Sequence, residues 1–366
     1  MMEVRLQVGK VIPPHPGRLL ERKKLINLLK QGEKKGIVYI SAPAGYGKTT
    51  LLTSYVSKHK GNLGWLTIDE GDRNLYLFLH YLVGSIQRVI PGFGVEISRM
   101  ITDGKSQNQD MIFNTVINEL ITIEKPMLLV LDDLHHIQDH PEISLFLHSL
   151  IINRLPHISL FIASRIDPSG RLSYALTKQA ALFITERQLR FRRDEMQKLA
   201  HAIGYKRLPN SKVNLLNRQS RGWAIAVVNG LNAIASGKRR PFDRLDDYFE
   251  AVFSDIDKQA RWYFLMASLL PHINQKLLDL IFPGEGKMVL KTLLSRGLFI
   301  TRLSDQENYL LHPLFKSYLA ERLKNADYRR YLRTKRCAGR HFLRSGHFAL
   351  AMDLLLEGEA FNLVLT

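Results

Sequence analysis

One stretch of the chain, Ile37 to Leu52 (IVYISAPAGYGKTTLL), restricts the possible fold more than any other. A short β-branched and apolar run leads into a small, glycine-containing turn, and the turn opens a helix at Lys48. Gly45 and Gly47 allow the backbone to bend so that successive N–H groups point at phosphate oxygens, and a helix N-terminus adds its dipole. This layout of strand, loop and helix is typical of a phosphate-binding P-loop.

The P-loop pattern predicts a nucleotide role for the residues of this turn. Lys48 is expected to reach the β- and γ-phosphates, and the Thr49 hydroxyl to bind Mg²⁺. The full pattern has glycine where this chain has Ala42, and a chance glycine turn before a helix is the competing interpretation. The residues expected to contact ATP or ADP are Ala44, Gly45, Tyr46, Gly47, Lys48, Thr49 and Thr50.

A second motif lies at Met127 to Asp132 (MLLVLD), which is followed by Asp133. Consecutive apolar residues that end in two carboxylates predict a buried parallel strand with acids at its carboxyl edge, where open α/β sheets bind ligands. Asp132 would hold Mg²⁺, usually through water, and Asp133 would orient the attacking water or accept its proton. An acidic turn after a core strand is the alternative, which the upstream P-loop makes the lesser one. His135 and His136 are interpreted as structural.

Another buried strand, Ile158 to Ser164, precedes Arg165. An arginine at the end of such a strand can sense the γ-phosphate and stabilise charge there, and a surface arginine is the competing interpretation. Further strands are expected at Leu63 to Asp69 and Leu182 to Thr185, whereas Pro91 to Asn108 is expected to be a surface loop. Residues 1–190 are therefore predicted to form an α/β P-loop ATPase core with a mostly parallel sheet.

Helical patterns dominate the chain after residue 190. We expect a helical lid at 191–240 and a winged-helix domain at 241–325, the latter because three helices precede a hairpin at Leu298 to Leu311. Two amphipathic helices follow, and they resemble the opening pair of a helical, tetratricopeptide-like repeat array. Residues 326–366 are therefore predicted to be the truncated start of such an array.

Composition narrows the class of protein. The 52 Lys and Arg residues exceed the 34 Asp and Glu residues, which gives a net charge of +18. The basic clusters, one of which runs from Arg329 to Arg340, are interpreted as solvated faces, in preference to a groove that binds nucleic acid. Cys337 is the single cysteine, so an intramolecular disulfide and a cysteine-rich metal site are excluded, and a cytoplasmic location fits. Polar residues interrupt the most apolar long stretch, so no membrane association is expected.

The motifs together resemble those of the MalT-like, large LuxR-type ATP-dependent transcriptional regulators, within the signal-transduction ATPases with numerous domains. By this resemblance, Lys48, Thr49 and Asp132 bind nucleotide and magnesium, and Arg165 is the sensor. His312 resembles the winged-helix histidine that touches the β-phosphate of bound ADP, with a core or capping histidine as the alternative. The motifs that carry the resemblance are APAGYGKTTLL at 42–52, WLTIDEGD at 65–72, LLVLDDLHHI at 128–137, ASR at 163–165, LRF at 189–191, GWA at 222–224 and HPLF at 312–315.

The resemblance implies a switch with slow ATP hydrolysis. ADP would hold a closed resting state, and ATP with an inducer would favour an open state that self-associates. The inducer, a small molecule or a protein, would bind the C-terminal repeats, and DNA would be bound only by a helix-turn-helix that this chain does not contain. One rival hypothesis is a P-loop ATPase with a winged helix that acts directly on DNA, of the origin-binding or remodelling type. Another is a scaffold that keeps ADP without turnover.

Overall fold

The computed structural model describes residues 6–15, 20–103, 109–205, 208–235, 245–303 and 307–360. The chain divides into two compact units, Met1–Lys206 and Arg207–Thr366, and each is described by itself. The lid, winged-helix and repeat boundaries within 191–366 stay a prediction. The expected junction between lid and winged helix, at residue 240, lies outside the described residues.

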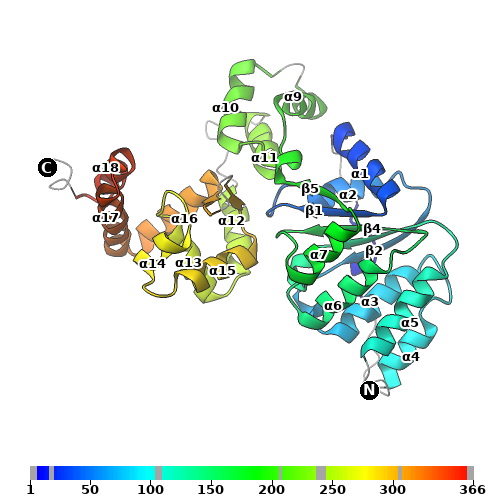
Figure 1. Ribbon diagram of the computed structural model, residues 1–366. Helices are drawn as coiled ribbons and strands as arrows, with labels where there is room; N and C mark the ends of the chain where they lie inside the picture. The colour runs from blue at the N-terminus through cyan, green and yellow to red at the C-terminus, as the bar shows by residue number, and fades with distance from the viewer. Residues whose placement is uncertain are drawn as a thin grey trace. The chain divides into compact units, whose positions relative to one another are not determined.

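The first unit alternates strands with helices (Figure 1). Its five strands are β1 (Ile37–Ser41), β2 (Asn62–Thr67), β3 (Met127–Asp132), β4 (Ile158–Ser164) and β5 (Leu182–Thr185). Its α-helices are α1 (Lys23–Lys35), α2 (Lys48–Val56), α3 (Leu75–Gln87), α4 (Val95–Asp103), α5 (Gln109–Ile121), α6 (Pro141–Ile152), α7 (Gly170–Lys178), α8 (Glu186–Leu189) and α9 (Arg193–Ala202). Short 3₁₀ helices lie at Val8–Lys10, Glu70–Arg73 and Leu134–His136.

The five strands form one sheet in the order β2-β3-β4-β1-β5, and every pairing in it is parallel. β1 lies between β4 and β5, with Ser41 opposite both Ser164 and Thr185. Because all five strands run the same way, their carboxyl ends meet at one edge of the sheet. The P-loop, the Asp132–Asp133 pair and Arg165 all follow strand ends at this edge.

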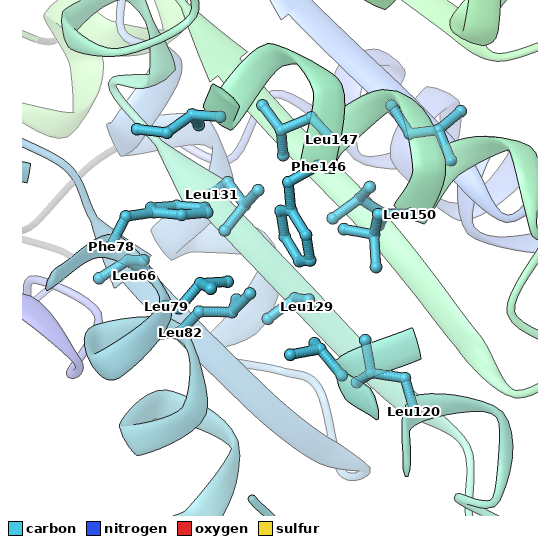
Figure 2. Close-up of a cluster of buried hydrophobic side chains, with 14 of the residues drawn as sticks. Leu66, Phe78, Leu79, Leu82, Leu120, Leu129, Leu131, Phe146, Leu147 and Leu150 are labelled. Carbon is cyan, nitrogen blue, oxygen red and sulfur yellow. The ribbon is translucent and has the colours of Figure 1, made fainter. Parts of the chain in front are cut away.

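Helices cover both faces of the sheet because its strands are apolar on both sides. On one face, α3, α5, α6 and α7 build a single hydrophobic core with alternate residues of the strands, such as Leu129 and Leu131 of β3 (Figure 2). On the other face, Gly32 of α1 lies so close to Val38 that a Cβ there would be 2.2 Å from the valine side chain. The parallel sheet and its helical layers confirm the predicted α/β P-loop fold.

One local prediction was wrong, because Val95–Asp103 forms helix α4 instead of a surface loop. Ile97 on this helix is fully buried in the core beside α3 and α5. Ile97, Met100 and Ile101 recur at helical spacing and pack on this core, so the burial of one apolar face stabilises the helix. Residues 104–108 of the expected loop lie outside the described residues.

The second unit is mainly helical. Its helices are α10 (Asn210–Ser220), α11 (Ala224–Ala235), α12 (Leu245–Ser254), α13 (Lys258–Ala267), α14 (Gln275–Ile281), α15 (Gly286–Arg296), α16 (Pro313–Ala326), α17 (Tyr328–Arg344) and α18 (Phe348–Glu357). β6 (Ile300–Arg302) and β7 (Tyr309–Leu311) pair antiparallel, so three helices followed by a hairpin are present as predicted. α17 and α18 pack against each other, but two helices do not establish a repeat array.

Aromatic side chains form the core of the second unit. The ring centroid of Phe299 lies 4.5 Å from that of Phe315 and 5.5 Å from that of Phe249. Trp223 stacks on Phe249 with a centroid distance of 5.7 Å. This core joins α11, α12 and α16 with the hairpin. Within the described residues, no helix has both the length and the apolar character needed to cross a membrane.

Candidate functional site

The P-loop adopts a phosphate-binding geometry. Gly45 and Gly47 have φ angles of 76° and 80°, in the left-handed region that L-residues with a side chain rarely adopt. Gly47 is the N-cap of α2 and offers no capping side chain, so the first N–H groups of the helix remain available to an anion. Ala44 and Tyr46 are buried in the loop, whereas Thr50 is exposed on α2.

Lys48 lies inside this loop and is 6% exposed. Its Nζ donates hydrogen bonds to the carbonyl oxygens of Ala42, at 2.6 Å, and Pro43, at 3.1 Å. Burial lowers the pKa of Lys48 to about 8, against the opposing fields of Asp133 and Asp132, while Arg165 lowers it further. The four predicted site residues from the P-loop, β3 and β4 therefore act on one another electrostatically.

Asp132 is buried at the end of β3, and its Oδ1 accepts the N–H of Asp133 at 3.0 Å. Burial and the neighbouring Asp133 charge raise the pKa of Asp132 to about 6, whereas the Thr49 hydroxyl and Lys48 oppose this shift. Within the described residues, no donor meets its Oδ2 in ordinary hydrogen-bond geometry. A buried carboxylate oxygen without a donor, beside a threonine hydroxyl, is a donor set that suits Mg²⁺.

Asp133 has φ 58° and ψ 38°, a left-handed conformation that Asp tolerates better than most residues. Its Oδ1 lies 3.6 Å from Nδ1 of His135, whose ring is buried. Burial and the nearby cations Arg165 and Lys48 hold the pKa of His135 far below its usual value, so this imidazole is neutral. The spacing of His135 and His136 is not typical of metal ligands. Only the turn after β3 shows that His135 lies close to Asp133.

A polar network joins the residues on either side of Arg165 in the sequence, Ser164 and Asp167, and was not predicted. The hydroxyls of Tyr39 and Ser164 donate to Oε1 of Gln138, at 3.0 and 2.9 Å, and Gln138 Nε2 donates to the Asp167 carbonyl at 3.2 Å. Ser41 Oγ donates to the Asp167 carboxylate. Gln138 thus ties β1, β4 and the segment after β3 together on both sides of Arg165. The only signal in the sequence was a serine at the end of two otherwise apolar strands.

A second unpredicted contact joins the P-loop to α8. The Tyr46 hydroxyl donates to Oε1 of Glu186 at 2.9 Å, and the same oxygen forms an ion pair with Arg190. Arg22, before α1, donates to the carbonyl oxygens of Leu189 and Arg190 and pairs with Glu195 of α9. The segment that connects the sheet to α9 is therefore held by charged side chains.

His312 lies in the second unit, at the N-cap of α16, and is 7% exposed. Its Nε2 donates to the Ser220 carbonyl at 3.1 Å, and its ring centroid lies 4.7 Å from that of Trp223. The HPLF and GWA motifs are thus in direct contact. The structure brings Lys48, Thr49, Asp132, Asp133 and Arg165 together in the first unit, and His312 has its described contacts in the second.

Two family models match the chain. Residues 30–168 match the AAA domain, and residues 249–331 match the MalT winged helix domain. These segments coincide with the P-loop sheet and with the helices and hairpin of the second unit.

Similar proteins include the HTH-type transcriptional regulator MalT of Cronobacter sakazakii, which is 28% identical over 315 residues, or 82% of this chain and 35% of that protein. The serine/threonine-protein kinase PknK of Mycobacterium tuberculosis is 27% identical over 355 residues, or 92% of this chain and 32% of that protein. The chain spans about a third of the length of these relatives. Together with the two family models, they confirm its resemblance to the MalT-like ATPase regulators.

The Walker-type ATPase of Pyrococcus abyssi has a similar fold, with a TM-score of 0.55 and 14% identity. The match covers 84% of this chain and 98% of that one. It supports the P-loop ATPase fold alone.

Proposed function

We propose that this chain is the nucleotide-dependent switch of a transcriptional regulator, with an ADP-bound resting state and an ATP-bound active state. The observation that carries the proposal is the convergence of Lys48, Asp132, Asp133 and Arg165 at one edge of the sheet, beside a P-loop with two left-handed glycines. The MalT relatives and the match to the MalT winged helix domain support the regulatory role.

Each residue has a distinct task in this proposal. The N–H groups at the start of α2 and the Lys48 ammonium hold the phosphates, and Thr49 and Asp132 hold Mg²⁺, which neutralises phosphate charge when bound. Asp133 orients the attacking water and accepts its proton, and Arg165 stabilises the charge on the γ-phosphate. Burial and the nearby cations lower the pKa of His135, so its neutral ring is too weak a base to take that proton in place of Asp133. Hydrolysis is slow and resets the switch.

ATP and ADP must bind the two states with different affinity, because equal affinity shifts no equilibrium. We assign the difference to Arg165, which senses the γ-phosphate, and to His312, which responds to the β-phosphate of ADP in the resting state. In the active state the protein self-associates in the cytoplasm. An inducer acts through the C-terminal repeats, and DNA is bound by a part of the regulator outside this chain.

The nucleotide released when the purified protein is denatured tests this function. Chromatography of the released material should show ADP in a near one-to-one ratio with protein, and the Lys48→Ala variant should release none. If the folded wild-type protein releases no adenine nucleotide and binds none on addition of ATP with Mg²⁺, the proposed function is wrong.

A P-loop ATPase that acts directly on DNA is a second candidate. The observation that favours it is the exposure of Lys287 and Lys291 on α15, in the segment that matches a winged helix. Tight binding of a DNA duplex that weakens steeply with salt would support this candidate, since released counterions reveal phosphate contacts. Weak binding that Lys287→Gln and Lys291→Gln do not change would leave the switch as the better account.

A further inference from the structure

Helix α17 carries a row of arginines that the proposed switch does not use. Its 17 residues include six arginines, one lysine and no acidic residue. Five of these arginines face a groove of about 590 Å³ beside α14, and together they span ~22 Å of the helix at ~1.5 Å per residue. The groove is lined by Leu280, Arg329, Leu332, Arg333, Arg336, Cys337, Arg340, His341 and Arg344.

The positive charges in this groove have few partners. Within the described residues, the guanidinium groups of Arg329, Arg333, Arg340 and Arg344 have no ion pair or hydrogen bond, and that of Arg336 donates to the Gly358 carbonyl. Like charges one helical turn apart repel each other and destabilise a helix, so an anion bound between them would relieve this repulsion.

Two acids of the neighbouring segments pair with residues outside the groove. Asp327 pairs with Arg330 at 3.5 Å, and Glu357 pairs with Lys335. Arg330 itself lies 4.8 Å from the Trp262 ring, outside the groove. The groove therefore combines a strong positive charge with no internal counter-charge, which an anionic ligand would provide.

The size and lining of the groove favour a small ligand over a nucleic acid. Ligand pockets in proteins are typically ~300–1,000 Å³. Two leucines form its apolar part, and no Phe, Tyr or Trp lines it, whereas proteins that bind single-stranded nucleic acid stack bases on such aromatic rings. The planar guanidinium group binds phosphate through two parallel hydrogen bonds, so a series of arginines suits a ligand with several phosphate groups.

We propose that the groove between α14 and α17 binds a small organic molecule that carries two or more phosphate groups. Arg333 and Arg340 lie at the centre of the row, on either side of Cys337, and are the principal phosphate ligands. Binding at this site is independent of the P-loop. Its role as the inducer site of the switch rests on the proposed function.

Cys337 makes the test local, because it is the only cysteine of the chain and its side chain is exposed in the groove. The rate of its reaction with a maleimide is measured with increasing inorganic tripolyphosphate, at about 0.15 M salt, where surface charges are screened beyond ~8 Å. We expect saturable protection of about fivefold or more with a midpoint below ~1 mM. Sulfate at equal ionic strength is the control for screening and should give no such protection.

Matched variants separate the groove from other basic surfaces. Arg333→Gln with Arg340→Gln should raise the midpoint roughly tenfold or more, which corresponds to about 1.4 kcal/mol. Arg333→Lys with Arg340→Lys keeps the charge but removes the two-pronged hydrogen bonding, so an intermediate midpoint is expected. Lys287→Gln with Lys291→Gln removes the same charge from α15 of the same unit and should leave the midpoint unchanged. Circular dichroism and thermal unfolding verify that each variant is folded.

Three results would overturn this proposal: no protection at millimolar tripolyphosphate, equal protection by sulfate, or protection by a DNA duplex alone. The Lys48→Ala variant, in which the P-loop cannot hold phosphate, should retain the protection. Loss of protection in Lys48→Ala would place the ligand in the P-loop and would also contradict the proposal. Nucleotide release tests the P-loop, and protection of Cys337 tests the groove beside α17. Failure of the proposed switch and failure of the proposed groove ligand can therefore be told apart.

Discussion

The hydroxyl of Tyr46, in the P-loop, donates a hydrogen bond of 2.9 Å to Oε1 of Glu186, the first residue of α8. Glu186 also pairs with Arg190, and Arg22 binds the Arg190 carbonyl. A side chain of the phosphate-binding loop is therefore connected to the segment that leads from the sheet to α9. We therefore expect a change in the P-loop to alter the segment that follows the sheet.

Tyr46→Phe tests this connection. The variant removes one hydrogen bond to a buried carboxylate that keeps its arginine partner, so we expect a loss of about 1–2 kcal/mol in the free energy of unfolding. Nucleotide affinity should fall as well, because the P-loop loses the hydrogen bond that holds Tyr46 to Glu186. Tyr55→Phe is the matched control, since Tyr55 lies at the far end of α2 and the variant removes its hydrogen bond to Glu33 of α1. Urea unfolding measures the stability of each variant. Nucleotide titration should give the same affinity for Tyr55→Phe as for the wild type.

The pKa of Asp132 predicts how stability depends on pH. Its folded pKa of about 6 exceeds the ordinary value of 3.8, so the folded chain keeps a proton that the unfolded chain has lost between these values. This contribution to stability is therefore present below pH 4 and is lost as pH rises through about 6. Asp132→Asn should abolish the decrease, measured by urea unfolding without nucleotide from pH 4 to 7. The exposed Asp194→Asn should retain it, and an unchanged decrease in Asp132→Asn would refute the assignment.

The same pKa predicts the pH dependence of magnesium binding. Mg²⁺ needs the ionised carboxylate, so its apparent affinity should fall about tenfold for each pH unit below about 6 and level off above it. Titration of Mg²⁺ into the nucleotide complex at several pH values measures this. A flat profile through pH 5 would show that Asp132 is not a ligand of the metal.

Asp133→Asn separates chemistry from binding. An amide cannot accept the proton of the attacking water, so we expect hydrolysis to fall by about 10²–10⁴-fold while nucleotide is retained. Lys48→Ala should lose the nucleotide itself. Single-turnover hydrolysis and nucleotide release distinguish the two variants. Retention of hydrolysis in Asp133→Asn would contradict the assignment of Asp133 as the base.

Gln138→Leu tests the network that joins Ser164 and Asp167. The change leaves the buried hydroxyl of Ser164 without its acceptor and removes one acceptor of Tyr39, so about 2 kcal/mol of stability should be lost. Hydrolysis should fall more than nucleotide affinity, because the network positions Arg165 and does not touch the P-loop phosphate site. Gln87→Leu, which removes an amide contact to the Phe93 carbonyl, is the control. Equal loss of hydrolysis in both variants would indicate a general effect on folding.

His312→Gln tests discrimination between nucleotides. Glutamine can keep the hydrogen bond to the Ser220 carbonyl but loses the imidazole and its contact with Trp223. We expect the variant to retain less ADP after purification and to keep its ATP affinity, whereas Lys48→Ala loses both. Parallel titrations with ADP and ATP measure the two affinities. The same loss for both nucleotides would assign His312 a purely structural role.

Much of the first unit follows from local sequence. Apolar runs bounded by turns predicted the strands near 37, 63, 127, 158 and 182, and glycine followed by lysine and threonine predicted the P-loop. These signals are local because strand formation and phosphate binding depend on neighbouring residues and on backbone N–H groups. Parallel strands also place their carboxyl ends at one edge, so the meeting of Asp132, Asp133 and Arg165 with Lys48 was predictable.

Other features needed the tertiary structure. The sequence motifs did not relate Tyr46 to Glu186, which is 140 residues away. Gln138 accepts hydrogen bonds from both β1 and β4 only because the strand order places these two strands side by side. Helix α4 forms because Ile97 is buried against other helices, and the arginines of α17 line a groove because α14 packs beside them. Side-chain burial and long-range hydrogen bonds depend on which elements become neighbours. The sequence by itself therefore determined the strands, the P-loop and the acidic strand end, while the packing of distant elements decided which side chains support that site.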